Sequence, residues 1–257
     1  MSDAPSQQGF QAADILAAFS LLTRLTVPVD HNISGVRAAA ATWAYPLVGA
    51  AVGALAATMA AFAGFLGAPE VFSASLALAT MVLVTGAMHE DGLADCADGL
   101  GGGKAKATRL MIMKDSRIGA YGAVALTIAL IARWSGIQGL AVNEALFWPL
   151  VAVGAASRAP MVAAMFFMQP AKDDGLSANV GLPPPASLAA SVGLALLICL
   201  LALGFGGISV LFWAFVGALP LLVLANNLVD GQTGDVLGGA QQCAEITALA
   251  AALAIVT

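Results

Sequence analysis

The segment best suited to chemistry is HEDGLADCAD, at residues 89–98. If this segment is helical, Asp91, Asp95 and Asp98 lie within an arc of about 60° on one face. Carboxylates packed this closely repel one another unless cations neutralise them, and hard divalent cations prefer oxygen ligands. We therefore predict a site for a hard divalent metal, at which the protein handles a phosphate or diphosphate group.

The residues that follow this segment are suited to binding phosphate oxygens. The run at Gly101 and Gly102, with Lys104 nearby, is expected to end the helix and free backbone N–H groups for a phosphate, although a flexible connector explains the run equally well. A helix beginning near Ser116 would direct free N–H groups toward an anion, with Arg117 placed for a bidentate contact. The alternative there is a capped helix with snorkelling charges. The predicted phosphate-binding residues are Lys114, Arg117, Ser116, Gly101, Gly102, Lys104 and Arg158.

Further ionisable residues are candidates for the same site. Asp115 could complete the metal shell, and His89, beside the acidic cluster, could act as a hydrogen-bond donor, a ligand or a base. Asp230 and Asp235, at the two ends of the segment DGQTGD, offer a second acidic face opposite the first. A lone histidine is more often structural, so the role of His89 stays open.

Charged residues also occur inside the apolar segments, where an unpaired charge is costly. Glu245 either pairs with Arg133 or Arg158 or reaches the site. Arg158 precedes Pro160, so a kinked helix could hold its guanidinium in a polar cavity. Glu90 lies off the face that the three aspartates share, and its role is open.

Composition indicates which elements position these residues. The chain is 60% apolar and 10% charged, against about 25% charged in soluble domains. Charged residues are absent from residues 38–69, 71–88 and 175–229, and each stretch is long enough for a membrane crossing of about 20 residues. We predict an all-α, polytopic membrane bundle of about seven spans, with an interfacial or partly inserted helix within residues 10–27. Residues 1–9 are expected to form a disordered tail and residues 10–257 a single transmembrane catalytic domain. The predicted spans lie within residues 38–69, 71–88, 118–140, 145–167, 175–229 (two spans) and 241–257.

The distribution of basic residues predicts the orientation of the bundle. Five of the ten basic residues lie between Lys104 and Arg117, and the positive-inside rule places this loop in the cytoplasm. The other segments rich in Asp and Gly fall on the same side, so the working face is expected to be cytoplasmic, in a bacterial plasma membrane. Basic residues do not outnumber acidic ones, so nucleic acid is not expected as a partner. The three cysteines have no spacing typical of a zinc site.

Three motifs carry a family resemblance. The pattern HxDGLADxxDGLGGG at residues 89–103, the run IMKDSRIGAYG at residues 112–122 and the pattern TGDxLGG at residues 233–239 resemble those of the cobalamin (5′-phosphate) synthase family, the adenosylcobinamide-GDP ribazoletransferases. The N-terminal segment and the residues YPLVGAAVG at 45–53 extend the resemblance over most of the chain. Where family members usually have an apolar residue after the histidine, this chain has Glu90.

The resemblance implies a reaction. Adenosylcobinamide-GDP would bind by its diphosphate, and a hydroxyl of α-ribazole or its 5′-phosphate would attack the cobinamide-side phosphorus and expel GMP. The implied cofactor is Mg²⁺, with two ions, and the implied metal ligands are Asp91, Asp95, Asp98 and Asp115. Asp235 is implied as a further ligand or as the base, and Asp98 and His89 are the other catalytic candidates. The implied partners are the two substrates and the lipid bilayer, while a homo-oligomer and docking of other corrinoid-assembly enzymes stay open.

Other protein classes share parts of this pattern. A CDP-alcohol phosphotransferase has related aspartate spacing on a membrane helix, but its motif continues with Ala-Arg where this chain has Leu100 and three glycines. An intramembrane prenyltransferase would also bind a diphosphate through acidic motifs. In an ion-coupled transporter the same acids would bind a transported ion, although they lie at one membrane edge. The reaction products would separate these classes.

Overall fold

The computed structural model describes residues 9–29 and 35–257, so the predicted tail at residues 1–9 lies outside the described part of the chain except for its last residue. Helices account for most of this part, and within it the only β pairing is an isolated bridge between Pro170 and Gln232. Six helices are long and apolar enough to cross a membrane, or seven if one bent pair forms a single span. The predicted all-α membrane bundle is therefore confirmed. The six are the continuous Ala40–Phe65, made of η1 (Ala40–Ala44) and α3 (Tyr45–Phe65), with α7 (Ala120–Val142), α8 (Phe147–Phe167), α10 (Pro185–Leu203), α11 (Gly206–Val229) and α12 (Gly234–Val256).

The acidic segment lies on a helix of its own. Helix α4 (Glu70–Thr85) ends at Gly86, and α5 (Met88–Gly102) begins after a bend of 84°. Gly86 and Ala87 both have positive φ, and the backbone N–H of Arg24 donates a hydrogen bond of 2.7 Å to the carbonyl of Val84 at this break. Because the chain turns here, the aspartates do not simply continue the preceding span.

The last helix starts earlier than predicted. It begins at Gly234, seven residues before the predicted start at residue 241, because the Thr233 hydroxyl accepts the Val236 N–H at 3.2 Å and caps its first turn. Hydropathy did not reveal this start, since the first turns are rich in glycine and glutamine. Asp235 consequently lies in the first turn of a helix, not in a loop.

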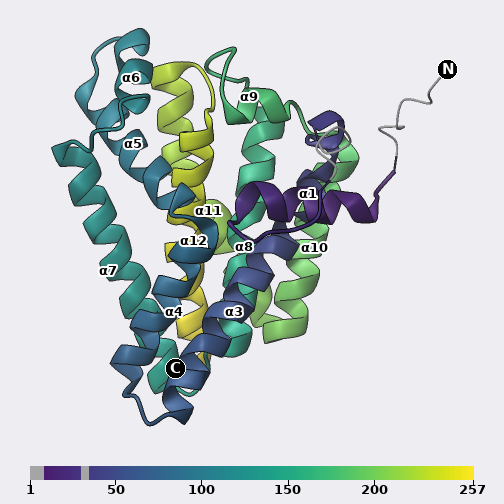
Figure 1. Cartoon of the computed structure of the whole chain (residues 1–257), viewed down its shortest axis with the longest axis vertical. Helices are drawn as coiled ribbons and strands as arrows, with labels where there is room; N and C mark the ends of the chain where they lie inside the picture. The colour runs from purple at the N-terminus through teal and green to yellow at the C-terminus, as the bar shows by residue number, and fades with distance from the viewer. Residues whose placement is uncertain (1–8, 30–34) are drawn as a thin grey trace.

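The N-terminal helix α1 (Ala12–Leu22) runs across the bundle instead of along it, as expected of an interfacial helix (Figure 1). It is shorter than the predicted segment, which extends to residue 27. The carboxylate of Asp14 accepts hydrogen bonds from Arg37 at 2.8 Å and from Trp43 at 3.0 Å. Burial raises the pKa of the Asp14 carboxyl, but these hydrogen bonds outweigh it and hold the pKa below its ordinary value.

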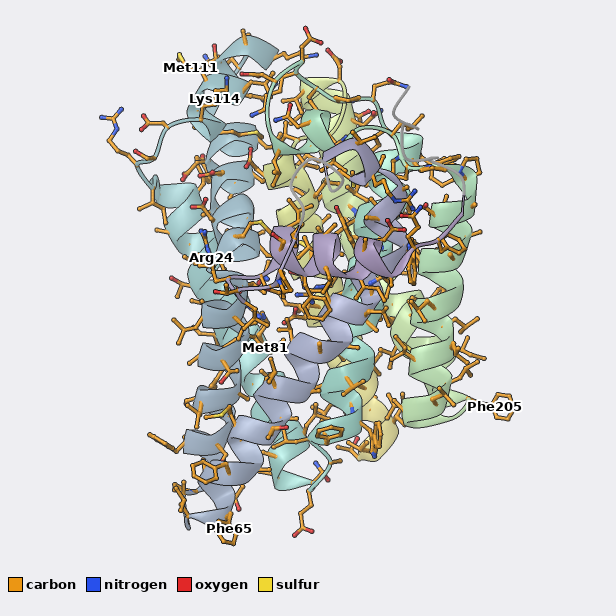
Figure 2. The ribbon with its side chains drawn as sticks, turned by 45° about the vertical axis from the view of Figure 1, so that its right-hand side comes forward. Arg24, Phe65, Met81, Met111, Lys114 and Phe205 are labelled. Carbon is orange, nitrogen blue, oxygen red and sulfur yellow. The ribbon has the colours of Figure 1, made fainter. Side chains whose placement is uncertain are left out.

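Glycine contacts and buried charges hold the spans together. A Cβ at Gly49 of α3 would lie 1.9 Å from the carbonyl oxygen of Gly154 in α8, so these helices pack backbone to backbone. The two ends of the bundle differ, with Met111 and Lys114 at one end and Phe65 at the other (Figure 2). Short helices α6 (Lys106–Met113) and α9 (Leu176–Val180) complete the fold.

Four charged side chains pair inside the bundle. Arg133 of α7 contacts Glu90 at 2.5 Å and Glu245 at 2.7 Å, and Arg158 of α8 contacts Glu245 at 3.4 Å. Gln242 accepts a further hydrogen bond from Arg133 at 2.9 Å. Glu245 thus pairs with both of its predicted partners, and Glu90 gains a structural partner.

Candidate active site

Glycines allow the two acidic segments to meet. A Cβ on Gly92 of α5 would lie 2.8 Å from the carbonyl oxygen of Asp235 in α12, and a Cβ on Gly238 would lie 3.3 Å from the Cα atom of His89. Because neither glycine has a side chain, the two helices pack closely at this point. The motif glycines thereby bring Asp235 next to the aspartates of α5.

The carboxylates of these helices interact electrostatically. The carboxylate of Asp95 is repelled by the charges of Asp91, Asp235 and Asp98. The carboxylate of Asp235 is also repelled by the charge of Asp91. Lys172 provides an opposing positive charge to both Asp95 and Asp235. Of the two residues predicted to form a second acidic face, Asp235 lies beside the α5 carboxylates, whereas Asp230 is exposed, pairs with Lys106 at 3.2 Å and does not line the pocket described below.

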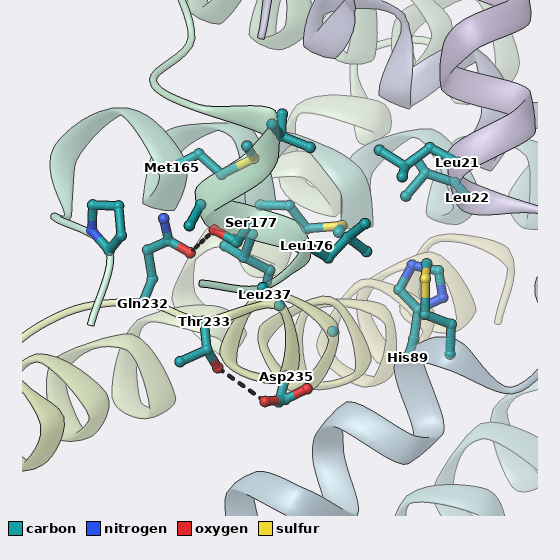
Figure 3. Close-up of a pocket in the computed structure, with 18 of the residues that line it drawn as sticks. Leu21, Leu22, His89, Met165, Leu176, Ser177, Gln232, Thr233, Asp235 and Leu237 are labelled. Atoms are coloured by element: carbon teal, nitrogen blue, oxygen red, sulfur yellow. Dashed lines mark hydrogen bonds between the residues drawn. The ribbon is translucent and has the colours of Figure 1, made fainter. Parts of the chain in front are cut away.

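A pocket opens beside these carboxylates. It encloses about 850 Å³ when the open space at its mouth is counted. Figure 3 shows His89 and Asp235 on its walls, with Leu21 and Leu22 of α1 at another side and a hydrogen bond from Thr233 to Asp235. The pocket is therefore polar along α5 and α12 and apolar beneath α1. Its charged lining residues are Asp91, Lys172, Asp174 and Asp235.

Asp98 has a different environment from the other aspartates. Its carboxylate accepts the backbone N–H groups of Gly119 at 2.7 Å and Gly122 at 2.9 Å, at the start of α7. A Cβ on either glycine would lie 2.3 Å from a carboxylate oxygen of Asp98, which explains the GAYG sequence. The helix that was expected to begin near Ser116 begins at Ala120, and the anion at its N-terminus is Asp98 itself.

The glycine run at residues 101–103 does not form the phosphate-binding loop that was predicted for it. The helix ends within the glycine run, as predicted, but α5 continues through Gly101 and Gly102. The end of a helix frees carbonyl groups, not the N–H groups that a phosphate needs. Close packing accounts for the run, since a Cβ on Gly101 would lie 3.1 Å from the Tyr121 ring. Lys104 is exposed beyond this end.

The loop before α7 does not place its charges on the pocket wall. Lys114 pairs with Asp174 at 2.7 Å, and Arg117 pairs with Asp115 at 2.6 Å. The hydrogen bonds from Arg117 hold the pKa of the Asp115 carboxyl below its usual value. Ser116 is exposed. Lys114 contacts the pocket indirectly through Asp174, whereas Asp115 and Arg117 form a separate surface pair.

His89 and Arg158 lie deep in the structure. His89 is buried and lines the pocket, and its Nε2 atom has no hydrogen-bond partner among the described residues. Arg158 is buried in α8, where it donates to the Ser157 hydroxyl at 2.8 Å and to Glu245, and it does not line this pocket. The arginine that was predicted to bind phosphate is therefore engaged in the buried ion network.

Three pocket residues had no clear signal in the sequence. Lys172, Ser177 and Gln232 come from two segments that are about 60 residues apart and join at the Pro170–Gln232 bridge. The Ser177 hydroxyl donates a hydrogen bond to the Gln232 side chain (Figure 3). Only the tertiary fold brings these residues together. A lysine before two aspartates otherwise suggests a solvated loop.

The donor set fits a hard divalent metal. Within residues 9–29 and 35–257, no three His, Cys, Asp or Glu side chains are arranged to hold one ion. Mg²⁺, however, is usually bound by one or two protein carboxylates together with substrate phosphates and water. Asp91, Asp95 and Asp235 provide hard oxygen donors from two facing helices. They therefore suit a metal that binds together with a diphosphate.

The close contact between α5 and α12 can be tested at Gly92. In Gly92→Ala, the new methyl group meets the backbone of Asp235, which cannot rotate away, so the two acidic segments must separate. We expect kcat/KM to fall by up to about 100-fold. Gly193→Ala in α10 is the control, because its Cβ would point into open space. Equal activity of both variants in lipid would contradict the proposed role of Gly92.

The fold and site define an integral membrane protein with an acidic pocket between helices, suited to phosphate chemistry. The chain belongs to the cobalamin-5-phosphate synthase family, whose model matches residues 14–253. It is similar to the adenosylcobinamide-GDP ribazoletransferases of Bradyrhizobium diazoefficiens, at 42% identity over 94% of both chains, and of Mesorhizobium japonicum, at 42% identity over 92% of this chain and 91% of the relative. The corresponding protein of Rhizobium meliloti is 38% identical over 94% of this chain and 97% of its own. No solved structure matches the chain.

Proposed function

We propose that this protein transfers the adenosylcobinamide-phosphate part of adenosylcobinamide-GDP to α-ribazole or α-ribazole 5′-phosphate. The family and the names of the relatives support this reaction. The observation that carries it is the approach of Asp235 to Asp91 and Asp95 beside a pocket. Such a carboxylate cluster is the arrangement that a diphosphate substrate with its metal requires.

In this reaction a hydroxyl oxygen of the ribazole bonds to the cobinamide-side phosphorus. The bond from that phosphorus to the GMP oxygen breaks, and the hydroxyl proton passes to a base. Asp235 is our candidate for that base, because it lines the pocket and lies beside the α5 carboxylates. His89 is the alternative, since its unpartnered Nε2 atom lies at a buried wall of the same pocket.

The proposed cofactor is Mg²⁺, held by Asp91, Asp95 and, if Asp235 is not the base, by Asp235 as well. When bound, it would neutralise charge on the diphosphate and on the departing phosphate oxygen. Asp98 is assigned to positioning, because it fixes the start of α7 against α5. Asp115 is the weakest of the proposed ligands, because Arg117 already neutralises it at the surface.

The proposed location is the bacterial inner membrane, with the pocket open to the cytoplasm. Lys172 and Asp174 line the pocket, and Asp174 pairs with Lys114 of the basic loop. The pocket therefore belongs to the end of the bundle that carries most of the basic residues. The positive-inside rule assigns this end to the cytoplasm.

The products of the purified protein in lipid test the reaction. Given adenosylcobinamide-GDP and α-ribazole 5′-phosphate, we expect GMP and cobalamin 5′-phosphate in equal amounts. Chelation with EDTA should abolish both products, and added Mg²⁺ should restore them. Folded protein that forms neither product would refute the proposal. CMP release from CDP-linked lipids, free diphosphate or ion flux would then identify one of the other classes.

A further inference from the structure

We propose that Lys172 binds a phosphate group of the substrate. This inference rests on the proposed function and adds to it a residue that determines which phosphate the site recognises. Lys172 lines the pocket together with Asp91 and Asp235. It is the only positively charged side chain among the described residues that line this pocket.

The backbone around Lys172 is fixed to the turn that precedes Asp235. The N–H of Gln232 donates to the carbonyl of Gln169 at 2.9 Å, and the N–H of Ala171 donates to the carbonyl of Gln232 at 2.8 Å. These two hydrogen bonds form the bridge between Pro170 and Gln232. The bridge therefore holds Lys172 near the first turn of α12.

Gly231 makes this pairing possible. Its φ is 155°, and a Cβ there would lie 2.1 Å from the carbonyl oxygen of Gln169. Only glycine allows the two segments to approach so closely without displacement of the backbone. The hydrogen bond between Ser177 and Gln232 ties the chain beyond Lys172 to the same turn. Contacts with Gln232 thus hold the chain on both sides of Lys172.

The charges around Lys172 favour a ligand with phosphate groups. Lys172 interacts electrostatically with Asp95, Asp235 and Asp174, yet no ion pair within 4.0 Å joins it to an acid in the described part of the chain. Lys114 and Arg117, by contrast, are paired with surface carboxylates. A phosphate oxygen between the acidic cluster and Lys172 could contact the metal on one side and the ammonium on the other.

Two substrate phosphates present this chemistry: the diphosphate of adenosylcobinamide-GDP and the 5′-phosphate of α-ribazole 5′-phosphate. The two sources can be separated, because α-ribazole is also a proposed acceptor and has no phosphate. A contact with the diphosphate affects reactions with both acceptors. A contact with the 5′-phosphate affects only the phosphorylated acceptor.

The experiment compares Lys172→Met, Lys172→Arg and the wild-type protein in lipid. The control is Lys106→Met, which removes another partly exposed lysine, paired with Asp230 at 3.2 Å, that does not line the pocket. We measure kcat/KM with α-ribazole and with α-ribazole 5′-phosphate. We also measure the Kd for adenosylcobinamide-GDP without acceptor, so that binding is followed without turnover.

Loss of a charge-assisted hydrogen bond should lower kcat/KM by about 10- to 100-fold in Lys172→Met. Lys172→Arg should stay within a few-fold of wild type, because it keeps the charge. A diphosphate contact predicts equal losses with both acceptors and a weaker Kd. A 5′-phosphate contact predicts a loss confined to α-ribazole 5′-phosphate and an unchanged Kd.

Two results would overturn the inference while the proposed function stands. One is wild-type behaviour of Lys172→Met with both acceptors, and the other is equal impairment of Lys172→Met and Lys172→Arg. Thermal unfolding of each variant, compared with Lys106→Met, shows whether an impaired protein is still folded. Absence of GMP release from the wild-type protein would instead refute the proposed function.

Discussion

Asp95→Asn is expected to abolish turnover while the protein stays folded in the membrane. Asp95 lies at the centre of the carboxylate cluster and feels the charges of Asp91, Asp98 and Asp235. The substitution keeps the shape of the side chain but removes the anion that a metal needs. Mutation of a residue that hydrogen-bonds to a metal ligand typically lowers activity about 10- to 100-fold. For a residue that binds the metal directly, we therefore expect activity to fall about 1,000-fold or more. GMP release by purified protein measures it.

The matched control for this variant is Asp173→Asn. Asp173 is exposed and does not line the pocket, although its chain neighbours Lys172 and Asp174 do. It should retain the activity of the wild-type protein, and neither variant should unfold at a lower temperature than the wild-type protein. Substantial activity in Asp95→Asn would remove Asp95 from the proposed metal site.

Arg133→Met is expected to prevent the protein from folding stably. Arg133 is 1% exposed and neutralises both Glu90 and Glu245. Without it, two buried carboxylates face only Arg158, so the interior carries an excess negative charge. Removal of one partner from a buried ion pair usually costs about 3–5 kcal/mol. The yield of monodisperse protein in detergent and its melting temperature measure the effect.

A second substitution tests whether charge causes this loss. In the double variant Arg133→Met/Glu90→Gln, one buried acid, Glu245, faces one buried arginine, Arg158, so the buried charges balance. It should recover part of the stability that Arg133→Met loses. If the double variant is no more stable than the single one, packing and not charge explains the role of Arg133.

The ion network also bears on the site. Glu90 is the neighbour of Asp91 on α5, and Glu245 lies on α12, the helix that carries Asp235. Arg133 contacts both glutamates, so it links these two helices through α7. The network therefore helps to hold the acidic segments at the close approach that Gly92 permits.

The sequence predicts the class of fold and much of the acidic site for physical reasons. Long stretches without charged residues indicate membrane spans, and helical spacing places Asp91 and Asp95 on one face. Pairing of Glu245 with the arginines follows from the cost of an isolated buried charge. These inferences need only composition, spacing and local chemistry.

Other features depend on tertiary contacts that no local pattern reveals. Asp98 has the same spacing as its neighbours, yet the start of α7 occupies its carboxylate. Lys172 reaches the pocket only because Gly231 lets two distant segments pair. Arg158 was expected to bind phosphate because it is a charged residue in a span, a feature shared by substrate sites and buried ion pairs.

Binding of Mn²⁺ as a substitute for Mg²⁺ tests whether the carboxylates of α5 and α12 form a metal site. Titrations of wild type, Asp95→Asn and Asp173→Asn, each with adenosylcobinamide-GDP and without acceptor, can be followed by loss of the electron paramagnetic resonance signal of free Mn²⁺. We predict that the wild-type protein and Asp173→Asn bind Mn²⁺ with the same affinity, and that Asp95→Asn binds Mn²⁺ at least about tenfold more weakly. Equal Mn²⁺ binding by all three proteins would contradict a metal site formed by the carboxylates of α5 and α12.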